Sequence, residues 1–142
     1  MVKTIFERIY DELDSLVGTL LAFLHGDVDH LKIECPGFMD LHIDRLTGER
    51  IALAHNFLQN GDVMADPDME ILVNEKTRTA EALTFQQSTL GIYVTVYPEP
   101  GRVDIRAKKE LNEFLLHWLS NLKKQGFFPP KFENGHRKPE PI

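Results

Sequence analysis

The dipeptide Asn60-Gly61 constrains the fold of this chain more than any other feature. It lies between two apolar stretches, residues 51–59 and 62–73. The favoured two-residue β-hairpin loop needs positive φ at both central positions, and Asn-Gly adopts that conformation with little strain. The sequence therefore predicts that the two stretches are neighbouring antiparallel strands. Across this hairpin, the residues expected to face each other are Gln59 and Asp62, Phe57 and Met64, and His55 and Asp66.

The apolar pattern changes parity inside the second strand. Met69 and Ile71 fall on the opposite parity from Met64. Because a one-residue slip exchanges the two faces of a strand, we expect one extra residue, a β-bulge, near Asp66-Pro67-Asp68. Proline suits a bulge, since it cannot donate to a central ladder. The bulge restores two expected pairs, Leu53 with Met69 and Ile51 with Ile71.

The expected bulge also marks a candidate polar site, because bulges are frequent beside functional sites. A histidine opposite an aspartate can share a hydrogen bond that fixes the imidazole tautomer and favours its charged form. Glutamine and tyrosine side chains from a later strand join the site if that strand neighbours the hairpin. The candidate binding residues are His55, Asn60, Asp62, Asp66, Gln86, Gln87 and Tyr93, with Asp68 as a further member. The alternative interpretation is structural: these are turn residues, and His55 is an interior histidine bonded to the backbone.

Two segments follow the 3.6-residue helical period. The first spans residues 3–25, where apolar residues recur from Ile5 to Leu24 and Gly26-Asp27 ends the helix. The second spans residues 107–125, with an apolar stripe that includes Trp118. Gly126 follows as a natural C′ residue. We expect one helix at each end of the domain.

Strands are expected between the two helices. Residues 29–35 and 38–46 alternate strictly, which is typical of an antiparallel sheet that is wet on one side. Their expected inward residues are Leu31, Ile33, Cys35, Met39, Leu41 and Ile43. Further strands are predicted at residues 78–87 and 90–97, and a short edge strand at residues 103–105.

These elements predict a single α+β domain over residues 1–126. Its antiparallel sheet has about five or six strands, with the N-terminal and C-terminal helices packed on it. Residues 127–142 contain four of the eight prolines and show no periodicity. We expect them to form a flexible tail, with Phe127 and Phe128 as residues that could dock on the domain.

The charge is unevenly distributed. Residues 1–100 contain 7 Lys and Arg against 17 Asp and Glu, a net charge of −10, whereas residues 101–142 contain 9 against 5, or +4. The acidic part argues against general nucleic-acid binding through phosphate contacts. It suits a basic partner or a metal ion, although most such charge is solvated surface. A weaker alternative is a nucleic-acid role for the basic segment with Trp118 and Phe127.

The remaining composition favours a cytoplasmic protein. The single cysteine, Cys35, cannot form an internal disulfide, which fits a reducing compartment. No signal peptide is visible, and the longest apolar run, residues 16–24, is too short to cross a bilayer. His30, His42 and His55 fall in three successive expected strands, but their spacing matches no ligand motif. We therefore predict no metal, no cofactor and no membrane association.

Five motifs between residues 50 and 126 carry a family resemblance. They are His55-x-x-x-Gln59-Asn60-Gly61-Asp62-x-Met64-x-Asp66-Pro67-x-Met69, Thr84-Phe85-Gln86-Gln87, Leu90-Gly91-x-Tyr93, Val96-Tyr97 and Leu111-Asn112-x-Phe114-x-x-x-Trp118-x-x-Asn121-Leu122-x-x-Gln125-Gly126. Through these residues the sequence resembles a family of domains of unknown function found on bacterial plasmids, prophages and conjugative elements, and its helical part is similar to small uncharacterised proteobacterial proteins. This resemblance implies a setting on a mobile element rather than a mechanism.

Two functional classes follow. The first is a small cytosolic binding or accessory protein of a mobile element, with a protein partner or a small polar ligand at the hairpin, acting as a monomer or homodimer. The absence of a Walker loop, dinucleotide fingerprint or nucleophile elbow from the sequence favours it. The second is a hydrolase-type enzyme. It would use His55 as a general base oriented by Asp66, or a divalent ion at Asp62, Asp66 and Asp68.

Overall fold

The computed structural model describes residues 2–129, 132–133 and 136–137, and it confirms an α+β fold. The helices are α1 (Ile5–Val17), α2 (Leu20–His25), the 3-10 helix η1 (Ser88–Leu90) and α3 (Ile105–Gln125). The strands are β1 (His30–Ile33), β2 (Leu41–Arg45), β3 (Arg50–Gln59), β4 (Asp62–Asn74), β5 (Thr79–Ala82), β6 (Thr84–Gln87), β7 (Ile92–Thr95), β8 (Phe132–Glu133) and β9 (His136–Arg137).

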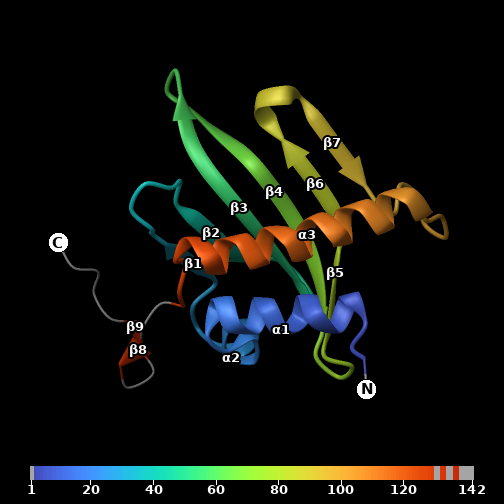
Figure 1. Ribbon diagram of the computed structural model, residues 1–142, viewed down its shortest axis with the longest axis horizontal. Helices are drawn as coiled ribbons and strands as arrows, with labels where there is room; N and C mark the ends of the chain where they lie inside the picture. Colours follow the sequence, from blue (N-terminus) through green and yellow to red (C-terminus); the bar gives the residue numbers. More distant parts are fainter. Residues whose placement is uncertain (1, 130–131, 134–135, 138–142) are drawn as a thin grey trace.

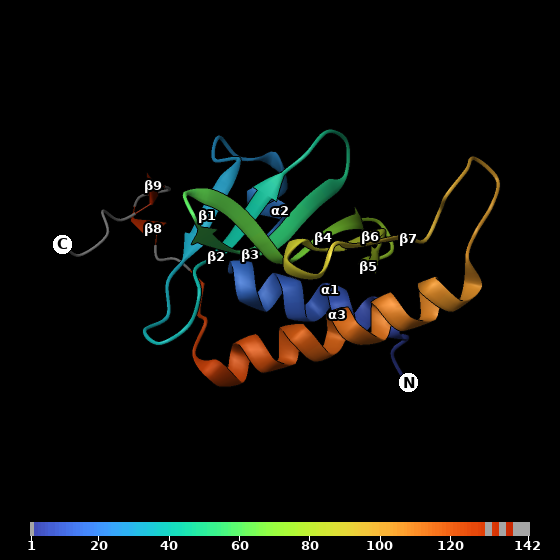
Figure 2. The same cartoon turned by 90° about the horizontal axis from the view of Figure 1, so that it is seen from above.

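A twisted antiparallel sheet forms one layer of the domain. Its strand order is β1-β2-β3-β4-β6-β7, and β5 also pairs with β4, so that the main sheet has seven strands. Both α1 and α3 lie on the same side of this sheet (Figures 1 and 2). The opposite side is not covered by either helix. The described part of the chain contains no helix that is long and apolar enough to cross a bilayer.

The central hairpin has the predicted turn and register. Asn60 and Gly61 have φ values of 53° and 85°, the positive angles that this turn requires. The confirmed pairs are Gln59 with Asp62, Phe57 with Met64, Leu53 with Met69 and Ile51 with Ile71. The predicted bulge is also present. Between the pairs Ala54–Asp68 and Asn56–Ala65, two residues of β4, Asp66 and Pro67, stand opposite His55 alone.

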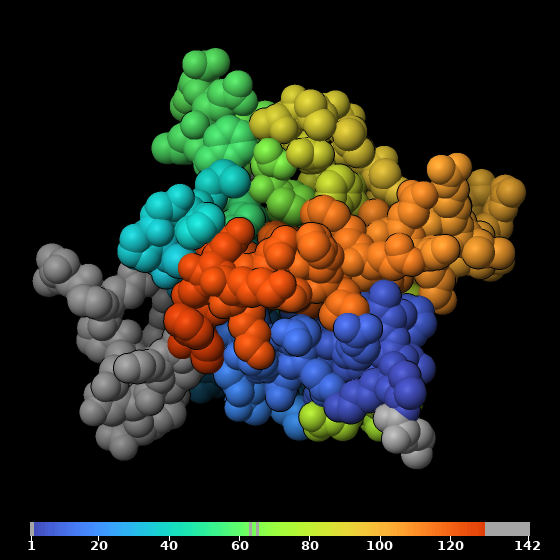
Figure 3. Space-filling view, in the orientation of Figure 1, coloured from blue at the N-terminus to red at the C-terminus, as the bar shows by residue number. Residues whose placement is uncertain are grey.

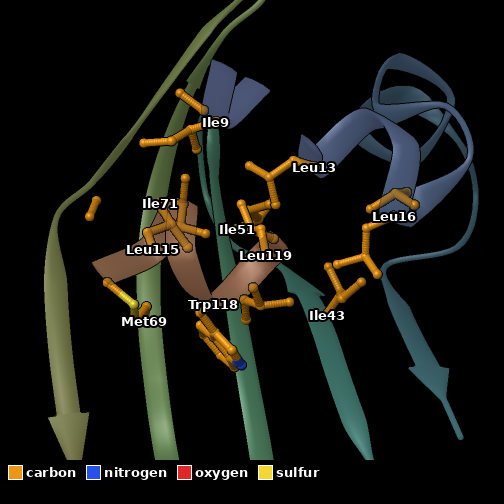
Figure 4. Close-up of a cluster of buried hydrophobic side chains, with 14 of the residues drawn as sticks. Ile9, Leu13, Leu16, Ile43, Ile51, Met69, Ile71, Leu115, Trp118 and Leu119 are labelled. Carbon is orange, nitrogen blue, oxygen red and sulfur yellow. The ribbon is translucent and has the colours of Figure 1, made fainter. Parts of the chain in front are cut away.

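The core lies between the sheet and the two long helices (Figure 4). Side chains of α1 and α3 meet the inward row of the strands. The fully buried residues include Ile9, Leu13, Ile43, Ile51, Met69, Ile71 and Leu115. A side chain of α3 also joins this helix to the sheet: Asn112 Oδ1 accepts a hydrogen bond of 2.8 Å from the backbone N–H of Ala82.

The N-terminal segment forms two helices instead of the single predicted helix. Gly18 adopts a φ of 99° and ends α1, with its N–H donating to the carbonyl of Asp14. Asp14 Oδ1 then accepts from the N–H of Leu20, the first residue of α2. At the other end of α2, Arg45 Nη1 donates to the carbonyls of Phe23, Leu24 and Gly26. Because apolar residues continue at helical spacing through Gly18, the sequence pattern did not reveal the break between α1 and α2.

Three other predictions need correction. The predicted strand 78–87 is divided at Leu83 into β5 and β6. The predicted edge strand 103–105 is wrong, because Asp104 caps α3 by accepting from the N–H of Ala107 at 3.0 Å, and the helix begins at Ile105. Met39, expected to face inward, precedes β2 and is exposed.

The predicted boundary after residue 126 falls inside the packed structure. Phe127 is buried in the core, whereas Phe128 is exposed. Gly126 is left-handed with a φ of 106°, as expected for a C′ residue. Beyond it, β8 and β9 pair with each other. The predicted flexible tail otherwise falls on residues 130–131, 134–135 and 138–142, which lie outside the described residues.

Candidate functional site

The predicted polar site is distributed over several places in the structure. His55 lies in the interior, between the sheet and α3, and Asp66 lies in the bulge. Asn60 and Asp62 lie at the exposed tip of the hairpin. Gln86 and Tyr93 pair on the uncovered side of the sheet, whereas Gln87 points to the helix side, beside Ile92. The alternation of side chains between the two faces of the sheet causes this separation. His55 shares a face with Leu53, whereas Gln86 shares one with Asp68.

His55 is an interior histidine, as the structural interpretation proposed. It pairs with Leu41 of β2, and the predicted direct pairing with Asp66 is wrong because the bulge lies at this position. Its Nδ1 lies 3.2 Å from the carbonyl oxygen of Asp40. Since a carbonyl only accepts, Nδ1 is the donor in this hydrogen bond.

The aspartates of the hairpin do not gather. Asp66 Oδ2 accepts a hydrogen bond of 3.4 Å from Thr89 in η1. Asp62 and Asp68 are six positions apart on an extended strand, a separation of about 20 Å. Among the described residues, no three His, Cys, Asp or Glu side chains form a group that could hold a metal ion. The three-aspartate group proposed for a divalent ion is therefore not assembled among the described residues.

One part of the predicted set does come together on the uncovered side of the sheet. Asp68 pairs with Ala54 on one side and with Gln86 on the other, and Gln86 pairs with Tyr93. Burial, and then the nearby carboxylates, raises the pKa of Asp68 above its ordinary value. Polar residues are common on the wet face of an antiparallel sheet, and this row is explained by that role.

A row of aromatic rings is the more distinctive feature, and the sequence did not reveal it. Six rings from the β1–β2 loop, β3, β6, α3 and the segment after α3 are in sequential contact. The ring centroids are 6.0 Å apart for Phe38–Phe127, 5.6 Å for Phe127–His55, 5.6 Å for His55–Trp118, 6.1 Å for Trp118–Phe114 and 5.2 Å for Phe114–Phe85. His55 therefore lies in the middle of the row.

The Phe85–Phe114 end of this row lies where the sheet is incompletely covered. The β3–β4 and β6–β7 hairpins extend beyond α3 (Figure 1), and Figure 3 shows them as two lobes beyond the helix. We call the apolar surface between the two hairpins the recess and define it by the incompletely covered apolar side chains that lie on the helix side of the hairpins and on α3. They are Phe57, Met64, Phe85, Ile92, Val94 and Phe114.

Phe114 shows how the recess differs from the core. Its ring packs edge-on against Phe85 at 83°, yet its side chain remains 38% exposed. Four residues along the helix, Trp118 is buried. The apolar face of the sheet therefore continues past the point where α3 covers it. The recess exists because the strands extend further than the part of the sheet that α3 covers.

The family model for the Domain of unknown function (DUF6908) matches residues 6–128. The chain belongs to this family. The DUF6908 match runs from α1 to the segment after α3 and includes all six rings of the aromatic row. It ends before the β8–β9 pair. No curated protein and no solved structure matches the chain significantly.

Proposed function

We propose that this DUF6908 protein is a binding module that takes an apolar segment of a partner protein, flanked by basic residues, into the recess. The observation that carries the proposal is the aromatic row, which is buried at Trp118 and open at Phe114. A row with this end uncovered provides a prearranged apolar surface. Aromatic residues and methionine are enriched in protein interfaces, and buried aromatic anchors contribute most of their binding energy.

The walls of the recess support an apolar ligand. Phe57 and Met64 face each other across the β3–β4 hairpin, and Phe85 and Val94 do so across β6 and β7. These side chains are only partly covered. An apolar side chain inserted between the two hairpins would cover them at about 25 cal/mol for each Å² removed from water.

The charge around the recess supports a basic flank. Asp62 lies at the tip of one wall and Asp66 lies in the bulge of the same strand. Residues 1–100 as a whole have a net charge of −10. Complementary charge at a rim mainly increases the association rate and the specificity of binding. A partner segment with lysine or arginine beside its apolar residues is therefore favoured over an acidic one.

The cellular setting belongs to the same proposal. The single Cys35 supports a reducing compartment, and the resemblance to domains on mobile elements supports an accessory role for such an element. The partner is then a protein of the element or of its host. We propose a cytoplasmic accessory protein without an enzymatic reaction of its own.

A random peptide library displayed on phage tests the proposal. The library is selected on the immobilised full chain, and enriched peptides are synthesised and titrated against the protein while the fluorescence of Trp118, the single tryptophan, is followed. We expect peptides with two or more large apolar residues and adjacent lysine or arginine. We also expect their binding to change the emission of Trp118, because this ring contacts Phe114 in the wall of the recess.

A matched pair of variants locates the binding. Phe57 and Leu58 are neighbours on β3 that point to opposite faces, and Leu58 is 73% exposed on the face away from the helices. Phe57→Ala should weaken binding at least about tenfold, which corresponds to about 1.4 kcal/mol. Leu58→Ala should leave it unchanged. Equal losses in both variants, or peptides without apolar residues, would contradict the proposal.

A further inference from the structure

The two edges of the main sheet differ in their protection against strand pairing. An edge strand presents unpaired backbone groups, and natural proteins usually protect it with charged side chains or proline. The edge strand β1 contains Lys32 and is followed by Glu34. The other edge strand, β7, reads Ile92-Tyr93-Val94-Thr95 and has no charge and no proline. Figure 1 shows β7 as the outermost strand on its side of the sheet.

The backbone pattern determines which groups of β7 are free. The N–H of Val96 donates to the carbonyl of Leu83, which places residues 83 and 96 at a hydrogen-bonded position of the ladder, although the N–H of Leu83 donates to Glu70 and the carbonyl of Val96 accepts from Asp104. In an antiparallel ladder such pairs alternate with non-bonded ones. Val94 and Ile92 therefore bond to β6, whereas the N–H and C=O groups of Tyr93 and Thr95 point away from the sheet.

Exposed apolar side chains gather beside this edge. Among the described residues, half of the exposed large hydrophobic side chains lie between residues 90 and 114. Leu90 is 66% exposed at the tip of the β6–β7 hairpin, and Tyr93 is 61% exposed on the strand itself. Ile105, at the start of α3, is exposed as well. Exposed apolar side chains beside an open edge are a feature of protein interaction sites.

We infer that β7 pairs antiparallel with β7 of a second copy of this chain, forming a two-fold symmetric dimer with one continuous sheet. An antiparallel pair of identical strands is compatible with two-fold symmetry. With Val94 on the two-fold axis, the outward-pointing N–H and C=O groups of Tyr93 bond to those of Thr95 in the other copy. The groups of Thr95 bond in the same way to Tyr93 of the other copy.

The charge of the protein opposes the pairing of two copies least at this edge. Each chain has a net charge of −6, so most of its surface repels another copy. The uncharged strand β7 avoids this repulsion. Four paired residues alone bury less than the roughly 800 Å² per partner of a standard interface. The neighbouring side chains of Leu90, Tyr93 and Ile105 supply additional apolar area.

Sedimentation equilibrium of the full chain tests the dimer. We expect a concentration-dependent monomer–dimer equilibrium. Tyr93→Lys and Thr95→Lys each place a charge in the paired strands, diagonally across from the same charge in the other copy, and should each weaken the dimer at least about tenfold, or about 1.4 kcal/mol. Leu58→Lys adds the same charge at an exposed position on another hairpin and should leave the equilibrium unchanged. Circular dichroism of each variant confirms that it folds.

Hydrogen exchange of the wild-type chain provides a second test that needs no substitution. The amides of Tyr93 and Thr95 should exchange more slowly as the protein concentration rises. The amide of Val94, which bonds to β6, should be protected at every concentration. A chain that remains monomeric, or a dimer that neither lysine weakens and that leaves the Tyr93 and Thr95 amides unprotected, would overturn the inference.

Discussion

Replacement of Asn112 should destabilise the protein strongly, although this residue belongs to the sequence motif that could be read as functional. Asn112 is 1% exposed, and its Oδ1 is the acceptor for the N–H of Ala82, which is itself fully buried. Its Nδ2 donates to the carbonyl of Lys108 at 2.7 Å. Asn112 therefore attaches α3 to β5 and helps to hold Phe114 over the recess.

The magnitude follows from the groups left without partners. In Asn112→Ala the buried N–H of Ala82 loses its acceptor, at a cost of about 1–3 kcal/mol. The side-chain volume removed from the core adds about 1 kcal/mol. The expected loss in the free energy of unfolding is therefore about 2–4 kcal/mol. For a domain of this size, that corresponds to a decrease in Tm of about 5–15 °C.

Urea titrations followed by circular dichroism measure this loss. Asn112→Leu fills the volume but supplies no acceptor, so it should still cost at least about 1 kcal/mol. Asn121→Ala, nine residues further along the same helix at a partly exposed position, should change stability by less than about 0.5 kcal/mol. An Asn112→Leu variant as stable as the wild type would refute the reasoning, because the hydrogen bond to Ala82 would then contribute nothing.

Three further substitutions test other parts of the structure. Burial raises the pKa of Asp68, so ionisation of this carboxyl destabilises the folded state as the pH rises through that pKa. Asp68→Asn should therefore raise Tm at neutral pH. Thermal melts should show that this gain in Tm disappears below the ordinary pKa of 3.8. Gly61→Ala forces a side chain into the φ of 85° and should cost about 1 kcal/mol or more in urea titrations. Arg45→Met removes three hydrogen bonds to carbonyls at the end of α2 and should cost about 2 kcal/mol; hydrogen exchange should accelerate first in α2.

The central hairpin could be predicted because its information is local. Asn60-Gly61 specifies the turn, and the turn fixes the register of the first pairs. The change in parity between Met64 and Met69 then requires an extra residue, which the structure contains beside Pro67. By contrast, the interruption at Gly18 was missed because apolar residues continue on both sides of it.

The candidate site could not be predicted, because it depends on distant pairings. Gln86 lies opposite Asp68 only through the register of β6 on β4. That register places it on the other face of the sheet from His55. The aromatic row depends on α3 crossing the sheet at Trp118, and the sequence contains no signal for this crossing. The periodicity correctly placed Trp118 on an apolar stripe, but it also placed Phe114 there, and Phe114 remains partly exposed.

Methyl NMR of the four methionines provides the most direct test of the recess as the binding site. Met64 lies in its wall, Met69 is fully buried in the core, and Met39 is exposed near the opposite end of the aromatic row. The protein is labelled at the methionine methyl groups and titrated with an apolar, basic peptide selected on the wild-type chain. The proposal predicts that the Met64 signal shifts with the binding curve, while those of Met69 and Met39 remain close to their free positions. A saturating peptide that leaves Met64 unmoved and shifts Met39 would contradict it.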